Sequence, residues 1–234
     1  MYLETLWNNV TLRQQNDQFR LSTDSVACAW FARFAGRSCI ADLGCGSGAI
    51  ALMLLASDPS LHLTGIELQP EAAAAARENA ASNQVDFTVV EGDLRQIRTL
   101  LSANSMDGVI SNPPYFPVGS GKQAVGALAK ARSEETCSLS QLCDAADWLL
   151  RWGGRFVLVH RPERLADLIW ELRSRRMEPK RIRFVRHKPG SPVSLVLLEA
   201  RKGGNPGLAY EPDLILLDHN GMETEEYRNM YHKE

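Results

Sequence analysis

Short apolar or β-branched segments alternate with helical segments along the middle of this chain, and that alternation limits the folds open to it. The segments expected as strands cover 39–43, 61–67, 87–91, 106–111 and 154–160. The segments expected as helices cover 24–34, 49–57, 71–82, 139–151 and 163–175. Strands separated by helices form a parallel sheet with helices on both faces, so we predict a doubly wound α/β fold.

The rhythm changes towards the C-terminus. Two expected strands, 181–186 and 194–200, follow each other directly across a loop with two prolines and a glycine. Such a connection forms a hairpin, which predicts an antiparallel strand at one edge of the sheet. We therefore divide the chain into an N-terminal extension and helix (1–36), a core domain (37–202) and a polar C-terminal tail (203–234).

Composition excludes several protein classes. The 234 residues are 44% hydrophobic and 23% charged, as in ordinary globular proteins. Five scattered cysteines without a CxxC pair argue against a disulfide framework and a zinc site. The longest apolar run, 49–56, is too short to cross a bilayer, and the N-terminus lacks a signal-peptide pattern. We expect a cytoplasmic protein without a metal site.

Positive charge is concentrated in one part of the chain. Residues 151–202 hold fourteen Lys and Arg against five Asp and Glu, an excess of +9, whereas the whole chain carries −2 and the remainder therefore −11. A basic face on an acidic protein can bind a polyanion. Solvated, aggregation-resistant surface is the alternative. We favour nucleic-acid binding by the densest part, with the contacts assigned to Arg173, Arg175, Arg176, Lys180, Arg181 and Arg183.

A glycine-rich turn follows the first core strand. It contains Asp42, Gly44, Gly46 and Gly48, and glycines there let a ligand approach the backbone and the next helix N-terminus. The pattern also satisfies the dinucleotide motif G-x-G-x-x-[GA]. A carboxylate at the mouth of the turn, however, suits the ammonium group of a ligand better than a pyrophosphate.

Two further acids follow the next strands. Glu67 ends the second core strand, where a carboxylate can bind both hydroxyls of a ribose. Asp93 closes the third strand, where it can accept a hydrogen bond from an adenine amino group. A dinucleotide site would also leave a further motif, Asn112–Tyr115 after the fourth strand, without a function.

That motif is Asn112-Pro113-Pro114-Tyr115. The prolines fix the backbone and remove two donors, which leaves carbonyl groups free to accept from a ligand. The asparagine oxygen is another acceptor, and the tyrosine ring offers a flat face. Two acceptors and a stacking surface suit an amino group conjugated to an aromatic ring or an amide. A proline turn that closes a strand is the plain alternative.

The ordered set of motifs resembles class I S-adenosylmethionine-dependent methyltransferases that modify amino groups. Residues 19–25, 131–135, 158–162 and 202–206 further resemble a bacterial subgroup related to the tRNA(Val) adenine-37 N6-methyltransferases. The resemblance implies a seven-stranded Rossmann-like sheet and S-adenosylmethionine as the cofactor. It also implies methylation of an adenine N6 in RNA, with tRNA favoured.

The resemblance also implies residue roles. Asn112 and the Pro113 carbonyl would hold the amino group, and Tyr115 would stack on the base. Thr23 and Asp24 would contact the methionine part of the cofactor, and Asn112 would lie beside it. Three alternatives stay open: methylation of a protein glutamine, methylation of guanine N2 in rRNA, and a non-catalytic RNA-binding protein with this fold.

Overall fold

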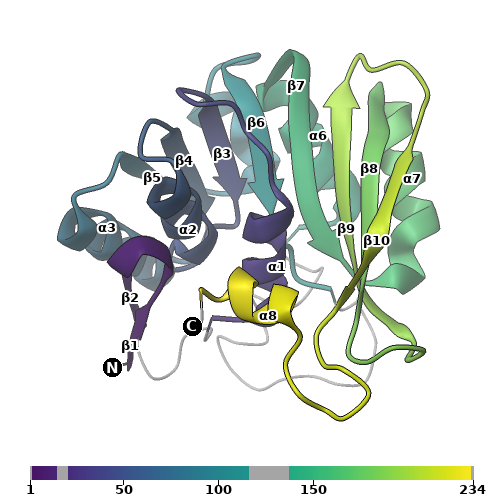
Figure 1. The fold of residues 1–234 in the computed structure, drawn as a ribbon. Helices are drawn as coiled ribbons and strands as arrows, with labels where there is room; N and C mark the ends of the chain where they lie inside the picture. Colours follow the sequence, from purple (N-terminus) through teal and green to yellow (C-terminus); the bar gives the residue numbers. More distant parts are fainter. Residues whose placement is uncertain (1, 15–20, 116–136, 233–234) are drawn as a thin grey trace, which may run out of the picture.

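The computed structural model describes residues 2–14, 21–115 and 137–232, and Figure 1 shows their arrangement. Its centre is an eight-stranded sheet with the order β10-β8-β9-β7-β6-β3-β4-β5. In chain order these strands are β3 (Cys39–Leu43), β4 (His62–Glu67), β5 (Phe87–Glu91), β6 (Met106–Ser111), β7 (Leu150–His160), β8 (Met177–Arg186), β9 (Val193–Lys202) and β10 (Ala209–Ile215). A small antiparallel pair, β1 (Tyr2–Thr5) and β2 (Thr11–Gln14), precedes them. The predicted α/β fold class is confirmed.

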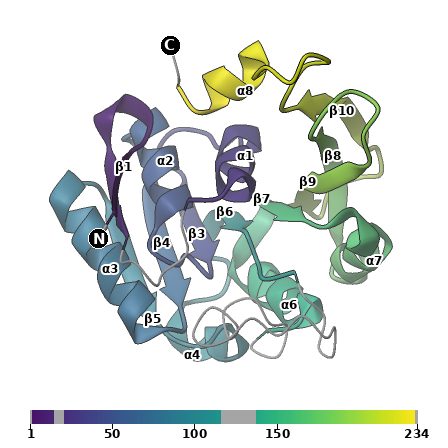
Figure 2. The same cartoon turned by 90° about the horizontal axis from the view of Figure 1, so that it is seen from below.

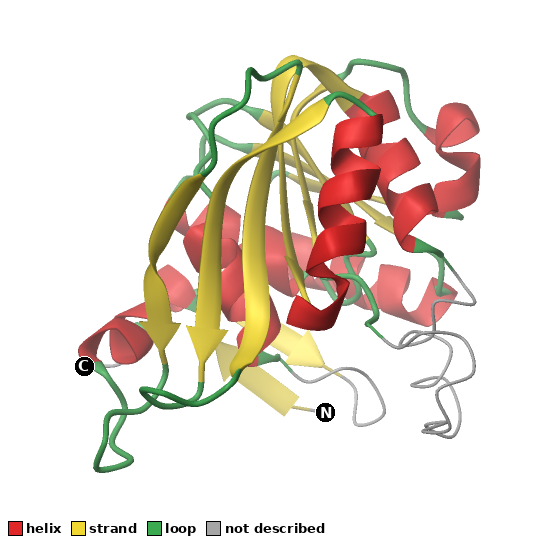
Figure 3. Ribbon diagram, turned by 90° about the vertical axis from the view of Figure 1, so that its right-hand side faces the viewer, coloured by secondary structure: helices red, strands yellow, loops and turns green. Residues whose placement is uncertain are grey.

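Helices cover both faces of the sheet, as Figure 2 shows. On one face of the sheet, a hydrophobic cluster is formed by sheet residues and by α1 (Thr23–Phe31), α2 (Ala49–Ser57) and α3 (Pro70–Asn83). On the other face, a second hydrophobic cluster is formed by sheet residues and by α4 (Ile97–Leu100), α6 (Leu139–Leu149) and α7 (Leu165–Ser174). The helix α8 (Glu225–Met230) and three short 3₁₀ helices, η1 (Trp7–Asn9), η2 (Leu94–Gln96) and η3 (Pro162–Arg164), complete the described elements. Figure 3 shows the helices on either side of the twisted sheet.

The local sequence accounts for several element boundaries. Pro70 occupies the first turn of α3, where its missing N–H costs no helical hydrogen bond. At the start of α6, Ser138 and Gln141 form a reciprocal capping box. The interior of α2 is apolar throughout, and every residue from 50 to 56 is buried. None of the helices in the described ranges is long and apolar enough to cross a membrane.

The C-terminal part differs from the expectation of seven strands and a polar tail. The hairpin of β8 and β9 is antiparallel, as predicted. It does not form the edge, because β10 pairs with β8 in parallel and becomes the eighth strand. The segment after residue 202 therefore contributes a strand and a helix to the fold.

The order of the parallel strands determines where a ligand can bind. From β3 the chain adds β4 and β5 on one side and then β6 and β7 on the other. The strand order thus reverses between β3 and β6, whose carboxyl ends are adjacent. Ligands of doubly wound sheets bind at such a reversal. Asp42 and Glu67 lie at the carboxyl ends of β3 and β4, Asp93 follows β5, and the Asn-Pro-Pro-Tyr motif follows β6.

Candidate active site

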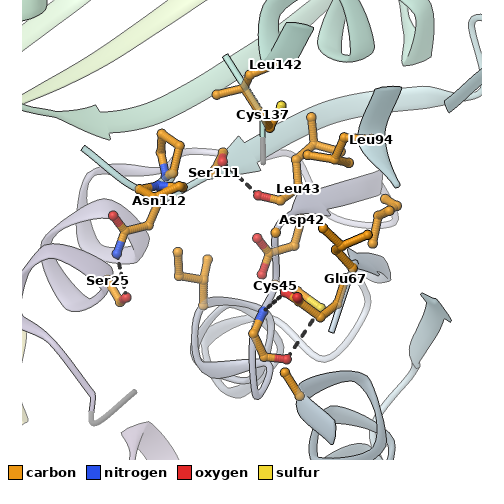
Figure 4. Close-up of a pocket in the computed structure, with 18 of the residues that line it drawn as sticks. Ser25, Asp42, Leu43, Cys45, Glu67, Leu94, Ser111, Asn112, Cys137 and Leu142 are labelled. Atoms are coloured by element: carbon orange, nitrogen blue, oxygen red, sulfur yellow. Dashed lines mark hydrogen bonds between the residues drawn. The ribbon is translucent and has the colours of Figure 1, made fainter. Parts of the chain in front are cut away.

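A cavity of about 1490 Å³ lies at the carboxyl ends of the parallel strands. Figure 4 shows several of its lining side chains. Of the twelve residues predicted from the sequence to bind cofactor or acceptor, ten line this cavity: Asp24, Asp42, Gly44, Gly46, Glu67, Asp93, Asn112, Pro113, Pro114 and Tyr115. The two that do not are Thr23 and Gly48.

The glycine turn is held by the end of β4. The Gly46 N–H donates to Glu67 Oε2 at 2.9 Å, and the Gly44 N–H donates to the Ile66 carbonyl at 2.8 Å. Gly48, at the start of α2, has a φ of 88°, and a Cβ there would lie 2.7 Å from the Phe87 ring. Gly48 is thus required by backbone conformation and packing, and it does not line the cavity.

Asp42 is a buried carboxylate that lacks a hydrogen-bond partner in the described part of the chain. Its side chain is 1% exposed, and among the described residues neither carboxylate oxygen has a hydrogen-bond partner. Burial, with the nearby Glu67 carboxylate, raises its pKa from 3.8 to about 7. An unpartnered buried carboxylate is costly, so a ligand that brings a positive charge or hydrogen-bond donors would be stabilised here.

The charges around the cavity exclude the dinucleotide interpretation. Its lining includes six acids (Asp24, Asp42, Glu67, Glu71, Asp93 and Glu163) and two arginines. A pyrophosphate would meet this negative field, and the Gly46 N–H that it would need already donates to Glu67. S-adenosylmethionine carries a sulfonium and an ammonium group, and the acidic cavity with the orphaned Asp42 oxygens fits it.

Asp93 and Thr23 have protein partners of their own. Asp93 accepts from the Arg95 backbone N–H and from its guanidinium, and the hydrogen bond to the guanidinium lowers the pKa of Asp93. Its side chain nevertheless lines the cavity. The Thr23 hydroxyl lies 3.1 Å from the Tyr231 hydroxyl and connects α1 to the C-terminal segment.

Asn112 is oriented by two neighbours. Its Nδ2 donates to Ser25 Oγ on α1 at 2.9 Å, and its Oδ1 accepts from the Tyr115 hydroxyl. Burial, with the Asp24 carboxylate nearby, raises the pKa of Tyr115 well above its usual value, so this hydroxyl remains a donor. An amide oxygen has two lone pairs. Asn112 thus keeps one acceptor position for a ligand.

Hydrogen bonding between strand ends supports this arrangement. Ser111 Oγ donates to the Leu43 carbonyl at 2.7 Å and connects the end of β6 to the end of β3 (Figure 4). Ser111 is fully buried. This bond holds the Asn-Pro-Pro-Tyr motif beside the glycine turn, where a cofactor and an acceptor can meet.

Three residues that line the cavity were assigned no role from the sequence. Ser25 orients Asn112 from a distance of 87 positions in sequence. His160 and Arg161 follow the end of β7 and also line the cavity. The shared signal is position at the carboxyl end of a parallel strand, which applied to β7 as it did to the earlier strands. Phe19, Arg20 and 131–135, part of the family resemblance, lie outside the described residues.

The predicted nucleic-acid contacts do not form one free basic surface. Arg181 pairs with Glu199 at 2.7 Å and Glu211 at 2.8 Å, and Arg183 pairs with Glu226 at 2.6 Å. The side chains of Arg181 and Arg183 are only 12% and 11% exposed. Intramolecular acids thus neutralise them.

Of the other four predicted contacts, Arg173 lies in α7, Arg175 and Arg176 lie between α7 and β8, and Lys180 lies in β8. Arg175 pairs with Asp144 at 2.6 Å and with Glu171, and Arg173 pairs with Glu178 at 3.1 Å. Lys180 donates to the Asn205 carbonyl at 3.1 Å. Arg176 is exposed, with no acidic partner among the described residues.

Three of the six residues predicted to contact nucleic acid precede β8, and these three lie far from the cavity. β8 runs parallel to β7, because β9 is antiparallel to both. Arg173, Arg175 and Arg176 therefore lie at the edge of the sheet opposite the cavity. The ten residues of β8 separate the two edges by about 30 Å.

Within the described ranges, no cluster of three or more His, Cys, Asp or Glu side chains could hold a metal ion.

Comparison with known proteins places this site in a family. Residues 31–169 match the family model described as the methyltransferase small domain. A tRNA1(Val) (adenine(37)-N6)-methyltransferase from Porphyromonas gingivalis is 35% identical over 195 residues, which cover 78% of this chain and 74% of that protein. A protein of the same name from Photorhabdus laumondii is 28% identical over 90% of this chain and 86% of its own length.

Solved structures agree on the fold. A crystal structure from Agrobacterium tumefaciens, described as a predicted O-methyltransferase, has a TM-score of 0.74 and covers 90% of this chain and 96% of that one, at 22% identity. At that identity the likeness concerns the fold alone. The family match spans the strands that build the cavity. This chain therefore belongs to the methyltransferase small domain family and is a class I S-adenosylmethionine-dependent methyltransferase.

Proposed function

We propose that this enzyme methylates N6 of an adenine in RNA, with tRNA as the substrate. The observation that carries the proposal is the Asn112 amide, whose nitrogen donates to Ser25 and whose oxygen keeps an acceptor position at the cavity. The oxygen is thereby set to accept from an amino group. The names of the relatives, at 28% and 35% identity, favour adenine in tRNA over the other amino-group substrates.

The acceptor amino group would be held by the Asn112 oxygen and the Pro113 carbonyl. Both accept hydrogen bonds, which leaves the nitrogen lone pair directed towards the cofactor side of the cavity. When bound, S-adenosylmethionine supplies the electrophilic methyl group. Asp42 and Glu67 would hold its positively charged part and its ribose. Positioning of this kind can contribute about 7–11 kcal/mol to catalysis.

Among the described residues that line the cavity, the one histidine, His160, is not a free base. His160 Nδ1 already accepts from the Arg161 backbone N–H at 2.8 Å, and burial lowers the pKa of His160 to about 4. The proton of the amino group can leave to water after transfer, because a nitrogen that has gained a fourth substituent is strongly acidic. We assign catalysis to orientation and to polarisation of the amino group.

RNA would reach the cavity along the segment that follows β7. Arg161 lines the cavity, is exposed, and has no acidic partner among the described residues. The other lining arginine, Arg164, pairs with Asp167 at 2.7 Å. A free guanidinium beside the acceptor site suits a phosphate group of the nucleotide to be methylated.

The direct test uses the purified enzyme with methyl-labelled S-adenosylmethionine and a mixture of bacterial tRNA, rRNA and protein. We expect label in tRNA, recovered as N6-methyladenosine by nucleoside mass spectrometry. The Asn112→Ala variant should lose about 100-fold in turnover, and calorimetry will report its cofactor binding separately. Label only in protein, or recovery as N2-methylguanosine, would contradict the proposal.

A further inference from the structure

His160 is the last residue of β7, the strand beside the one that carries the acceptor motif. Leu158 pairs with Ser111 in the parallel register of β7 and β6. His160 therefore lies level with the start of the Asn-Pro-Pro-Tyr motif, and its ring contacts the Tyr115 ring edge-on at a centroid distance of 5.3 Å. It is 1% exposed and lines the same cavity.

The hydrogen bonding of the ring fixes its tautomer. Nδ1 accepts from the Arg161 backbone N–H at 2.8 Å, so Nδ1 holds a lone pair. A neutral imidazole must then carry its proton on Nε2. Burial lowers the pKa to about 4, which keeps the ring neutral at physiological pH. His160 is thus a neutral donor through Nε2–H.

This donor has no hydrogen-bond partner among the described residues. The residue as a whole is 1% exposed, and the cavity is the open space beside its ring. A bound molecule that places an acceptor atom there would give Nε2–H a partner.

We propose that His160 Nε2–H donates to the ring nitrogen that adjoins the amino group of the acceptor base. This inference rests on the proposed function. In adenine, N6 has an acceptor on each side, N1 on the pairing edge and N7 on the opposite edge. A site with an acceptor at Asn112 and a donor at His160 complements an amino group beside such a nitrogen. His160 is then a specificity-determining residue.

The test combines chemical changes in the RNA with changes in the enzyme. tRNA is assembled by ligation with adenosine, 1-deazaadenosine or 7-deazaadenosine at the methylated position. The wild-type enzyme should lose about 10-fold in kcat/KM with one of the two analogues, the one that lacks the bonded nitrogen. The identity of that analogue distinguishes N1 from N7.

Two variants of His160, combined with the modified RNAs, complete a double-mutant cycle between enzyme and substrate. His160→Leu should lose about 10-fold with adenosine and show no further loss with the sensitive analogue. His160→Gln, which keeps a side-chain N–H, should recover part of the loss. Melting temperature and cofactor binding, measured for each variant, separate a local effect from unfolding. The wild-type analogue series stands even where a variant does not fold.

Three results would overturn the inference. The first is full activity of His160→Leu, and the second is equal rates of the wild type on all three RNAs. The third is a loss of about 100-fold when His160→Leu acts on the sensitive analogue, because independent losses multiply. A wild-type enzyme inactive on the unmodified adenosine RNA would instead contradict the proposed function.

Discussion

At the scale of single residues, Asp42 illustrates how a functional group lowers the stability of its own fold. Its carboxyl group is buried without a hydrogen-bond partner among the described residues. Its pKa lies at about 7 in the folded protein, against 3.8 in the reference state. Between these values the folded state keeps a proton that the unfolded state has lost. The stability of the ligand-free protein therefore falls as the pH rises from about 4 to about 7.

We predict that Asp42→Asn removes this pH dependence, because asparagine never ionises. The difference in unfolding free energy, variant minus wild type, should increase between pH 4.5 and pH 8. The shift in pKa sets an upper limit of roughly 4 kcal/mol on that increase. Denaturant unfolding at both pH values measures it, and any constant cost of the amide cancels in the comparison. Equal differences at the two pH values would refute the assignment.

The same substitution should weaken cofactor binding. An ionised Asp42 is the partner that we assign to the positive charge of S-adenosylmethionine, so the variant stabilises the empty site and impairs the occupied one. Residues of this kind were predictable because an acid at the carboxyl end of a parallel strand lies at the ligand edge of the sheet. Ser25 was not predictable, because its bond to Asn112 depends on how α1 packs against the sheet.

At the scale of elements, the parallel strands β3 to β7 could be predicted from the sequence, whereas β10 could not. The strands β3 to β6 and the second half of β7 are short runs rich in apolar residues, which the alternation with helices made recognisable. The first residues of β7, from Leu150, were not expected as strand, because 139–151 was expected as helix. β10 contains Pro212 and two acids in seven residues, and its register shifts between Glu211 and Leu214. Proline is tolerated there because the strand lies at the edge of the sheet.

The pairing partners of β10 explain why a charged segment forms a strand. Glu211 pairs with Arg181, and Asp213 pairs with Arg186 at 2.5 Å. The excess of positive charge in 151–202 is thus partly neutralised by the acidic C-terminal segment. A count of charges along the sequence could not distinguish this internal partner from a nucleic acid.

Side chains of helix α8 contact both α1 and strand β8 near the edge of the sheet. The Glu226 carboxylate accepts from Arg183 through two hydrogen bonds of 2.6 and 2.7 Å, and from Trp30 Nε1 at 3.4 Å. Met230 is fully buried at the end of α8. Because α1 carries Ser25, this packing supports the residue that orients Asn112.

We predict that Glu226→Gln lowers the unfolding free energy by about 1 kcal/mol and increases amide hydrogen exchange in α1. The loss is moderate because the Glu226 side chain is 40% exposed, while Arg183 keeps its bond to the Pro212 carbonyl. Glu225→Gln is the matched control, because Glu225 is exposed on the same helix. Its effect should stay within about 0.5 kcal/mol. Equal loss in both variants would show that the ion pair does not support α1.

At the scale of the whole molecule, the proposed RNA substrate has two exposed arginines at opposite edges of the sheet to which it could bind. The cavity opens at the carboxyl ends of the parallel strands, where Arg161 lies. Arg176 is a similar exposed arginine, but it precedes β8 at the opposite edge. The two residues mark two different surfaces along which a tRNA could lie.

We predict that the RNA contacts the cavity edge. Arg161→Gln should weaken tRNA binding at all sequences and reduce the slope of log K against log salt by about one, because one phosphate contact is lost. Arg176→Gln removes the same charge about 30 Å away and should leave both the affinity and the slope unchanged. Filter binding between 50 and 200 mM salt measures both variants against the wild type. The reverse result, with only Arg176→Gln sensitive to salt, would place the RNA on the β8 surface and require a long substrate that also reaches the cavity.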